Sequence, residues 1–107
     1  MRKQRYRAFR AYEPGKLQGF LDNLFRRTPR DHYIVKVVSK GIGNEELFDL
    51  LEKYRSKIDW YRKEKSLVFV LDDYDPDEVP EWIIVAPSEL EASDIIDFEE
   101  IERDLGF

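Results

Sequence analysis

Three acidic side chains at alternate positions come closest to a metal-binding pattern in this sequence. Asp73, Asp75 and Asp77 stand at the first, third and fifth positions, as in the opening of a calcium loop. Such a loop then needs glycine at the sixth position and a bidentate carboxylate at the twelfth. The sequence has Glu78 and Ile84 at those positions. We therefore predict no ordered metal site, with loose divalent-ion binding as the remaining alternative.

Two glycines, Gly41 and Gly43, stand between a predicted strand and a predicted helix, where dinucleotide-binding turns hold their glycines. The third glycine of that motif is replaced by Glu46. Glu45 and Glu46 would also repel the phosphate that a helix N-terminus attracts. We interpret the two glycines as turn residues and predict no cofactor.

The only histidine, His32, follows Asp31 in a predicted strand. A carboxylate can orient a histidine that acts as a general base, but neighbours in a strand point to opposite faces. The chain has no cysteine, which excludes disulfides, thiolate metal sites and a cysteine nucleophile. We predict that the protein is not an enzyme and has no catalytic residues.

Charge is distributed unevenly along the chain, although the formal net charge is only −5. Residues 1–40 contain eleven Lys or Arg and three acids, and residues 41–65 contain six of each. Residues 66–107 contain fourteen acids and one Arg, Arg103. Such asymmetry points to a charged partner or tail. The alternative is that the two halves fold together and neutralise each other.

The length of 107 residues fits one domain, residues 1–107, and the 42% hydrophobic content suffices for a core. No apolar run approaches the roughly 20 residues that cross a membrane. The basic N-terminus lacks the apolar segment of a secretory signal. We expect a cytoplasmic protein without membrane contact.

The predicted fold is organised around residues 31–40 (Asp31 to Lys40), with the sequence DHYIVKVVSK. Apolar residues occupy both faces of this strand, for example Val35 on one face and Ile34 on the other. A strand that is apolar on both faces suits the interior of a sheet with something packed on each side. We therefore expect it to be the central strand.

Helical spacing of apolar residues predicts a helix over 16–27 and a second over 45–55 with Asn44 as its N-cap. Ser88 and Glu91 have the spacing of a capping box and predict a helix from 89, either continuous to 105 or broken near 93–97. The predicted strands are 2–12, 31–40, 58–62, 66–72 and 82–86, with 58–62 and 66–72 forming a hairpin.

The resulting order, β-α-β-α-β-β-β-α, predicts an α+β fold: a two-layer sandwich with a mixed sheet. The opening of this order resembles that of Alba-type chromatin proteins and of the C-terminal domain of translation initiation factor 3. The resemblance is one of element order and implies a fold rather than a function.

The acidic C-terminal third of the chain, residues 66–107, suggests a regulatory or inhibitory protein that docks a partner with a basic surface. We expect the acidic loop to supply the contacts: Asp72, Asp73, Asp75, Asp77, Glu78 and Glu81. The alternative hypothesis is nucleic-acid binding through the arginine- and aromatic-rich N-terminal segment, which Arg26, Arg27 and Arg30 could extend. Its candidate residues are Arg2, Lys3, Arg5, Tyr6, Arg7, Arg10, Arg26, Arg27 and Arg30. Head-to-tail association into a homo-oligomer through opposite charges is a third outcome.

Overall fold

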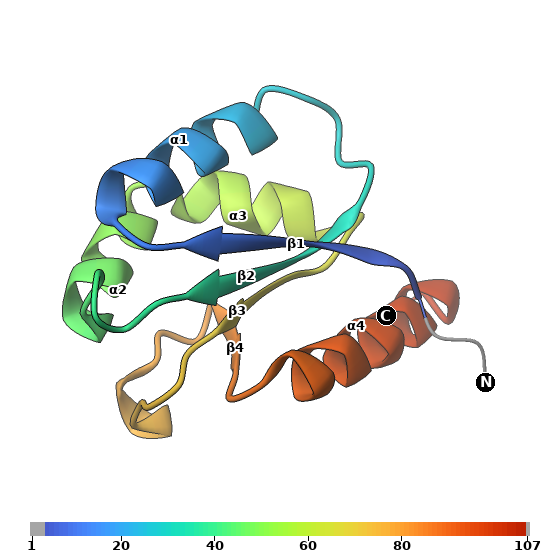
Figure 1. The fold of residues 1–107 in the computed structure, drawn as a ribbon. Helices are drawn as coiled ribbons and strands as arrows, with labels where there is room; N and C mark the ends of the chain where they lie inside the picture. The colour runs from blue at the N-terminus through green and yellow to red at the C-terminus, as the bar shows by residue number, and fades with distance from the viewer. Residues whose placement is uncertain (1–3, 107) are drawn as a thin grey trace.

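The computed structural model describes residues 4–106 and is built on one four-stranded sheet (Figure 1). All neighbouring strands are parallel. Their order in space is their order in the chain: β1 (Tyr6–Ala11), β2 (His32–Val37), β3 (Leu67–Val70) and β4 (Ile84–Ala86). β2 and β3 are the interior strands, which agrees with the expected central position of residues 31–40.

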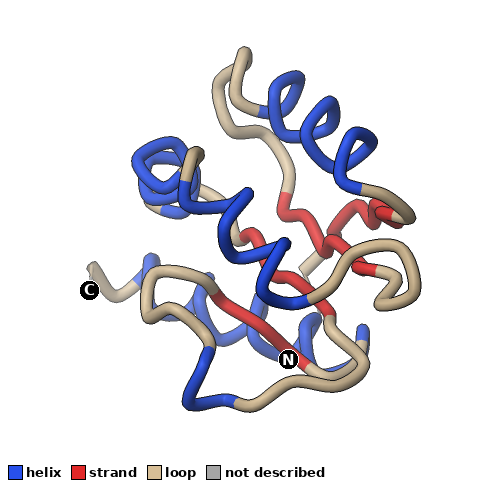
Figure 2. Tube along the Cα trace, turned by 90° about the vertical axis from the view of Figure 1, so that its left-hand side faces the viewer, coloured by secondary structure: helices blue, strands red, loops and turns tan. Residues whose placement is uncertain are grey.

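Helices cover both faces of the sheet. One face carries α1 (Pro14–Leu24), α2 (Asn44–Glu52) and α3 (Arg55–Arg62), and the other carries α4 (Glu89–Asp104) (Figure 1). Figure 2, seen from the side toward which the strands point, shows helices on both sides of the four strands. Within residues 4–106, no helix is both long enough and apolar enough to span a bilayer.

The alternation of side chains along β2 explains these two layers of helices. Val35 and Val37 belong to the larger buried cluster, with Leu17 of α1 and Leu51 of α2. Ile34 belongs to the second buried cluster, with residues of α4. Because successive side chains of a strand point to opposite faces, a strand that is apolar on both faces needs cover on both.

The mixture of helices and strands is as expected, but the two-layer sandwich with a mixed sheet was wrong. The sheet is wholly parallel. Parallel neighbours need a crossover between each pair of strands, and the crossovers contribute α1, α2 and α3. The final helix, α4, then covers the second face, so the architecture has three layers.

The predicted hairpin is absent because residues 58–62 form the second half of α3 rather than a strand. Tyr54, Ile58 and Tyr61 are buried and recur at helical spacing. The aromatic residues Trp60 and Tyr61 favour strands in isolation, but burial on one helical face outweighs that preference. The observed order is β-α-β-α-α-β-β-α, with a second helix in place of the first strand of the predicted hairpin.

Two helix boundaries follow from local chemistry. The Ser88 hydroxyl accepts a hydrogen bond from the Glu91 backbone N–H at 3.2 Å, which confirms the predicted cap of α4. α4 then runs without a break to Asp104. Asn44 is the first residue of α2 rather than its cap, and its side chain donates to the Asp73 carbonyl at 2.7 Å.

Candidate functional site

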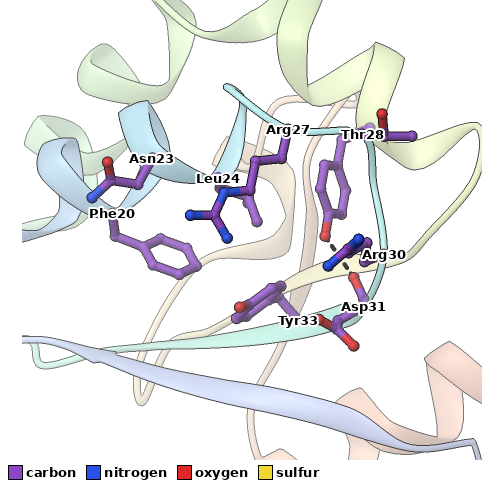
Figure 3. A pocket seen from close by; sticks show the side chains of 9 residues that line it. Phe20, Asn23, Leu24, Arg27, Thr28, Arg30, Asp31 and Tyr33 are labelled. Atoms are coloured by element: carbon purple, nitrogen blue, oxygen red, sulfur yellow. Dashed lines mark hydrogen bonds between the residues drawn. The ribbon is translucent and has the colours of Figure 1, made fainter.

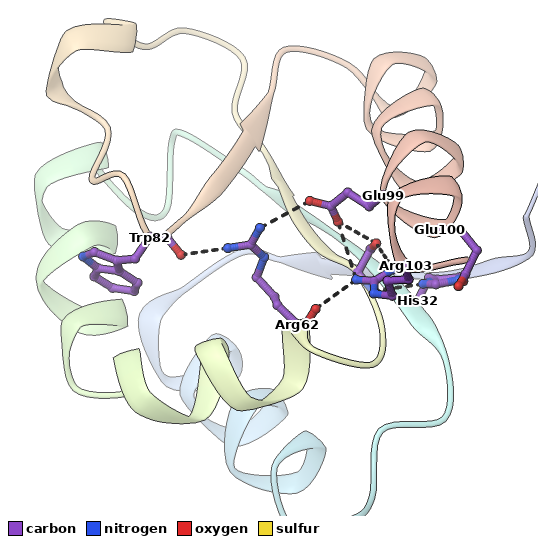
Figure 4. Close-up of polar contacts among 7 residues, drawn as sticks. His32, Arg62, Trp82, Glu99, Glu100 and Arg103 are labelled. Atoms are coloured by element: carbon purple, nitrogen blue, oxygen red, sulfur yellow. Dashed lines mark hydrogen bonds and ion pairs between the residues drawn. The ribbon is translucent and has the colours of Figure 1, made fainter. Parts of the chain in front are cut away.

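A polar cluster connects α4 to the beginnings of β2 and β3 (Figure 4). His32 is 3% exposed, and its Nδ1 accepts a hydrogen bond from the Ser66 backbone N–H at 2.9 Å. Its Nε2 lies 2.8 Å from Glu100 Oε2. The imidazole is therefore neutral, with its proton on Nε2, and burial lowers its pKa. The Ser66 hydroxyl donates to Glu99 and not to the imidazole, unlike the serine of a catalytic triad.

Glu99 is the centre of the same cluster. Its carboxylate accepts a hydrogen bond from Ser66 Oγ at 2.6 Å and one from Arg62 Nη2 at 3.3 Å. Arg103, one turn later on α4, approaches it at 3.8 Å. Arg62 also donates to the Trp82 carbonyl at 3.4 Å. These contacts link the second half of α4 to Arg62 at the end of α3.

The beginning of α4 is fixed through Glu89. Its carboxylate accepts the Tyr6 hydroxyl of β1 and pairs with the Lys36 ammonium of β2. The hydrogen bonds from Lys36 and Tyr6 lower the pKa of Glu89, and the same bond to Glu89 raises the pKa of Tyr6. Part of the acidic third, namely Glu89, Glu99 and Glu100, is therefore engaged inside the fold.

The acidic loop is arranged differently. The loop connects β3 to β4. All six of its acidic side chains are exposed. None of them forms an ion pair within residues 4–106. In the same part of the chain no three His, Cys, Asp or Glu side chains are grouped closely enough to hold a metal ion. The loop thus presents dispersed negative charge to solvent.

Several contacts hold the acidic loop in one conformation. The Asp75 side chain accepts the Asp77 backbone N–H at 2.9 Å at the start of a short 3₁₀ helix, η1 (Pro76–Glu78). Tyr74 and Trp82 pack against the larger buried cluster on either side of η1. The bond from Asn44 to the Asp73 carbonyl ties the loop to α2.

The predicted turn glycines lie beside this loop, and Gly41 has a steric reason to be glycine. A Cβ on Gly41 would stand 1.5 Å from the Tyr12 carbonyl oxygen. Gly43 has no atom within 4 Å of such a Cβ. The 41–43 turn therefore depends on Gly41, which lets the turn pass close to the end of β1.

A cavity of about 380 Å³ lies at the opposite end of the strands, where β2 begins. It is bounded by the end of α1, the 25–31 loop, the start of β2 and Tyr61 of α3. Arg27 and Arg30, two of the predicted arginines, line it, and Figure 3 shows Arg27 directed toward Phe20 and Tyr33. Arg7 reaches this end of the sheet by an ion pair of 3.2 Å with Asp31.

Among the described residues, the other predicted basic side chains do not line this cavity. Arg10 is aligned with Lys36 and therefore faces the α4 side of β1, where its guanidinium lies 5.4 Å from the centroid of the Tyr12 ring. Tyr6 also faces α4. Arg5 and Arg26 are exposed but do not line the cavity. Arg2 and Lys3 lie outside the described residues.

Sequence reasoning missed the remaining walls of the cavity, which are Phe20, Asn23, Leu24, Thr28, Asp31, Tyr33 and Tyr61. They belong to segments that the sequence does not connect. The one signal was Tyr33, an aromatic residue near the start of a strand whose other apolar residues are aliphatic. Comparison of the chain with protein-family models, with curated proteins and with solved structures found no match.

Proposed function

We propose that this protein is a non-enzymatic regulatory or inhibitory protein that docks a partner protein with a basic surface through its acidic loop. The observation that carries the proposal is the contrast between two groups of acids. Glu89, Glu99 and Glu100 of α4 are engaged by cationic or hydrogen-bonding groups of the sheet and α3. The six loop acids are all exposed and unpaired within residues 4–106.

Charge that is not neutralised internally is available for recognition. A cluster of exposed acids attracts a basic partner over a Debye length of roughly 8 Å at physiological salt and raises the association rate. The anchoring of the loop by Tyr74 and Trp82 supports the proposal further. A surface that is already ordered loses less conformational entropy when it binds. We place this activity in the cytoplasm, which suits a chain without cysteine.

The test compares capture by the unmodified protein with capture by two variants of equal charge change. The loop variant carries Asp73→Asn, Asp75→Asn, Asp77→Asn and Glu78→Gln. The change Asp75→Asn keeps a side-chain oxygen that can cap the 3₁₀ turn. The control variant neutralises four exposed acids elsewhere: Asp59, Glu64, Glu91 and Asp104.

We expect a protein captured by the unmodified chain and by the control variant to be lost with the loop variant. Equal capture by all three would show that the loop is not the docking surface. Light scattering at low and high salt distinguishes a foreign partner from self-association. Head-to-tail oligomers would form at low salt and dissociate as salt screens the charges.

A second candidate function is nucleic-acid binding through the basic end of the sheet. The observation in its favour is that Arg27 and Arg30 line one aromatic-walled cavity, and that Arg7, which is distant from them in the sequence, pairs with Asp31 of the same lining. Guanidinium groups contact phosphates without reading sequence, and aromatic rings stack on unpaired bases.

This second function predicts salt-sensitive binding of a labelled single-stranded oligonucleotide. The triple variant Arg7→Gln, Arg27→Gln, Arg30→Gln should weaken binding and flatten its salt dependence, because each lost phosphate contact lowers the salt slope by about one unit. Lys57→Gln, which removes an exposed charge from α3, serves as the control. Absence of binding at low salt would eliminate this candidate.

A further inference from the structure

The cavity at the beginning of β2 has the size of a small-molecule site. Its volume of about 380 Å³ lies near the lower end of the range of roughly 300–1,000 Å³ that ligand pockets occupy. A site of this size favours a ligand no larger than a single nucleotide. Its walls come from α1, the 25–31 loop, β2 and α3, so both the sheet and the helices fix its shape.

One side of the cavity is a preformed aromatic wall. The Phe20 ring meets the Tyr33 ring edge to face, with centroids 5.2 Å apart, and stacks against Phe9 at 4.2 Å. The Tyr61 hydroxyl donates to the Asp31 carbonyl at 2.6 Å, which fixes a third ring. Rings held in place by their neighbours present a flat apolar surface without further loss of entropy. Such a wall suits a planar ring.

Two arginines bring positive charge to the same cavity. Arg27 and Arg30 are exposed, and neither forms an ion pair within residues 4–106. The only carboxylate in the lining, that of Asp31, is engaged by Arg7. Two guanidinium groups are thus left for an anion, and their planar donor geometry matches phosphate oxygens. Asn23 and Thr28 add neutral polar groups to the lining.

We propose that this cavity binds a phosphorylated nucleotide, with the base against Phe20 and Tyr33 and the phosphate on Arg27 and Arg30 (Figure 3). This inference rests on the second candidate function and assigns the ligand of that basic end. Two sources supply the same chemistry: a free nucleoside monophosphate and the 5′-phosphorylated end of a single strand. The acidic loop lies at the other end of the strands and takes no part.

The first experiment titrates the labelled protein with adenosine monophosphate and follows backbone amide signals by NMR. We expect saturable shifts at residues 27–33. Arg27→Gln or Arg30→Gln should weaken binding about tenfold, since each removes a charge-assisted hydrogen-bonding group. Lys57→Gln should leave binding within about twofold, because exposed charges that do not contact the ligand are screened. Thermal melting checks that each variant is folded.

Two further ligands test the two halves of the site. Adenosine, which lacks the phosphate, and inorganic phosphate, which lacks the base, should each bind at least about tenfold more weakly than adenosine monophosphate. Inorganic phosphate that binds as tightly as the nucleotide would overturn the assignment of the aromatic wall. Absence of shifts at residues 27–33 with adenosine monophosphate would overturn the proposal as a whole.

A second experiment separates the two sources. A labelled single strand of six nucleotides is compared with and without its 5′-phosphate. Tighter binding of the phosphorylated strand, with the difference abolished by Arg27→Gln, identifies the strand end as the ligand. Binding of the monophosphate without any effect of the 5′-phosphate identifies the free nucleotide.

The same measurements separate this inference from the function on which it rests. Oligonucleotide binding that is lost in the Arg7, Arg27 and Arg30 triple variant but unchanged by Arg27→Gln alone, with no monophosphate binding, would overturn the cavity assignment alone. Monophosphate binding without oligonucleotide binding would eliminate nucleic-acid binding and leave the cavity as a nucleotide site.

Discussion

The Nε2 atom of His32 lies 2.8 Å from Oε2 of Glu100, and the other ring nitrogen accepts a backbone hydrogen bond from Ser66. This arrangement needs a neutral imidazole. A proton on Nδ1 would face the Ser66 N–H, so protonation removes a hydrogen bond and places two donors against each other. The contact of His32 with Glu100, one of those that join α4 to the sheet, is therefore sensitive to acid.

We expect the free energy of unfolding to fall as the pH drops below 6.5. Burial lowers the pKa of His32 in the folded state, whereas the unfolded chain has a pKa near 6.5. In the window between these two values the unfolded state binds more protons, so acid favours unfolding. The contribution of neutral His32 to the free energy of unfolding is fully present above pH 6.5 and is lost as the pH falls toward the folded-state pKa.

Chemical denaturation between pH 7.5 and 5 measures this dependence. The variant His32→Asn should show a flatter profile over that window, because asparagine does not titrate. A variant as steep as the unmodified protein would assign the pH dependence to other groups.

Truncation of Glu99 should destabilise the fold more than truncation of another acid on α4. Glu99→Ala leaves Arg62 and the Ser66 hydroxyl without their carboxylate partner. Arg62 and Glu99 side chains are 23% and 16% exposed, so the expected loss is about 2 kcal/mol. Asp104→Ala, at an exposed position, should change stability by about 0.5 kcal/mol or less. Equal effects in urea denaturation would contradict the role of the cluster.

Gly41→Ala and Gly19→Ala should have opposite effects on stability. A Cβ at position 41 would stand 1.5 Å from the Tyr12 carbonyl oxygen, so the backbone of the turn must move. We expect a loss of about 2 kcal/mol or more from this strain. Gly19 lies within α1 with open space around it, and alanine there should stabilise by about 0.5–1 kcal/mol. If thermal or urea denaturation finds that Gly41→Ala does not change stability, the turn can accommodate a Cβ near the Tyr12 carbonyl oxygen, which contradicts this prediction.

Local patterns predicted several elements correctly. The two apolar faces of β2 and the capping serine of α4 are properties of short segments, and the structure confirms both. α3 was missed because Trp60 and Tyr61 favour strands, while the burial of Ile58 and Tyr61 on a helical face depends on tertiary packing. This error also concealed the parallel sheet, because the predicted hairpin of 58–62 and 66–72 implied antiparallel neighbours.

The candidate sites divide in a similar way. The acidic loop is contiguous in the sequence, so its residues could be named in advance. That these acids lie apart from cations could not be predicted, because only the fold shows that Lys36 and Arg62 pair with α4 and not with the loop. The cavity joins Phe20, Arg27, Tyr33 and Tyr61 from distant segments. Aromatic residues in such positions appear in a sequence simply as core.

Site-specific photo-cross-linking in cells tests the docking surface most directly. A photoreactive residue in place of Asp77, at the tip of the acidic loop, is compared with one in place of Asp104 at the end of α4. The account predicts a discrete cross-linked partner from position 77 that is absent from position 104 and that disappears when Asp73, Asp75 and Glu78 are also neutralised. A partner captured equally from both positions, or none from position 77, would contradict it.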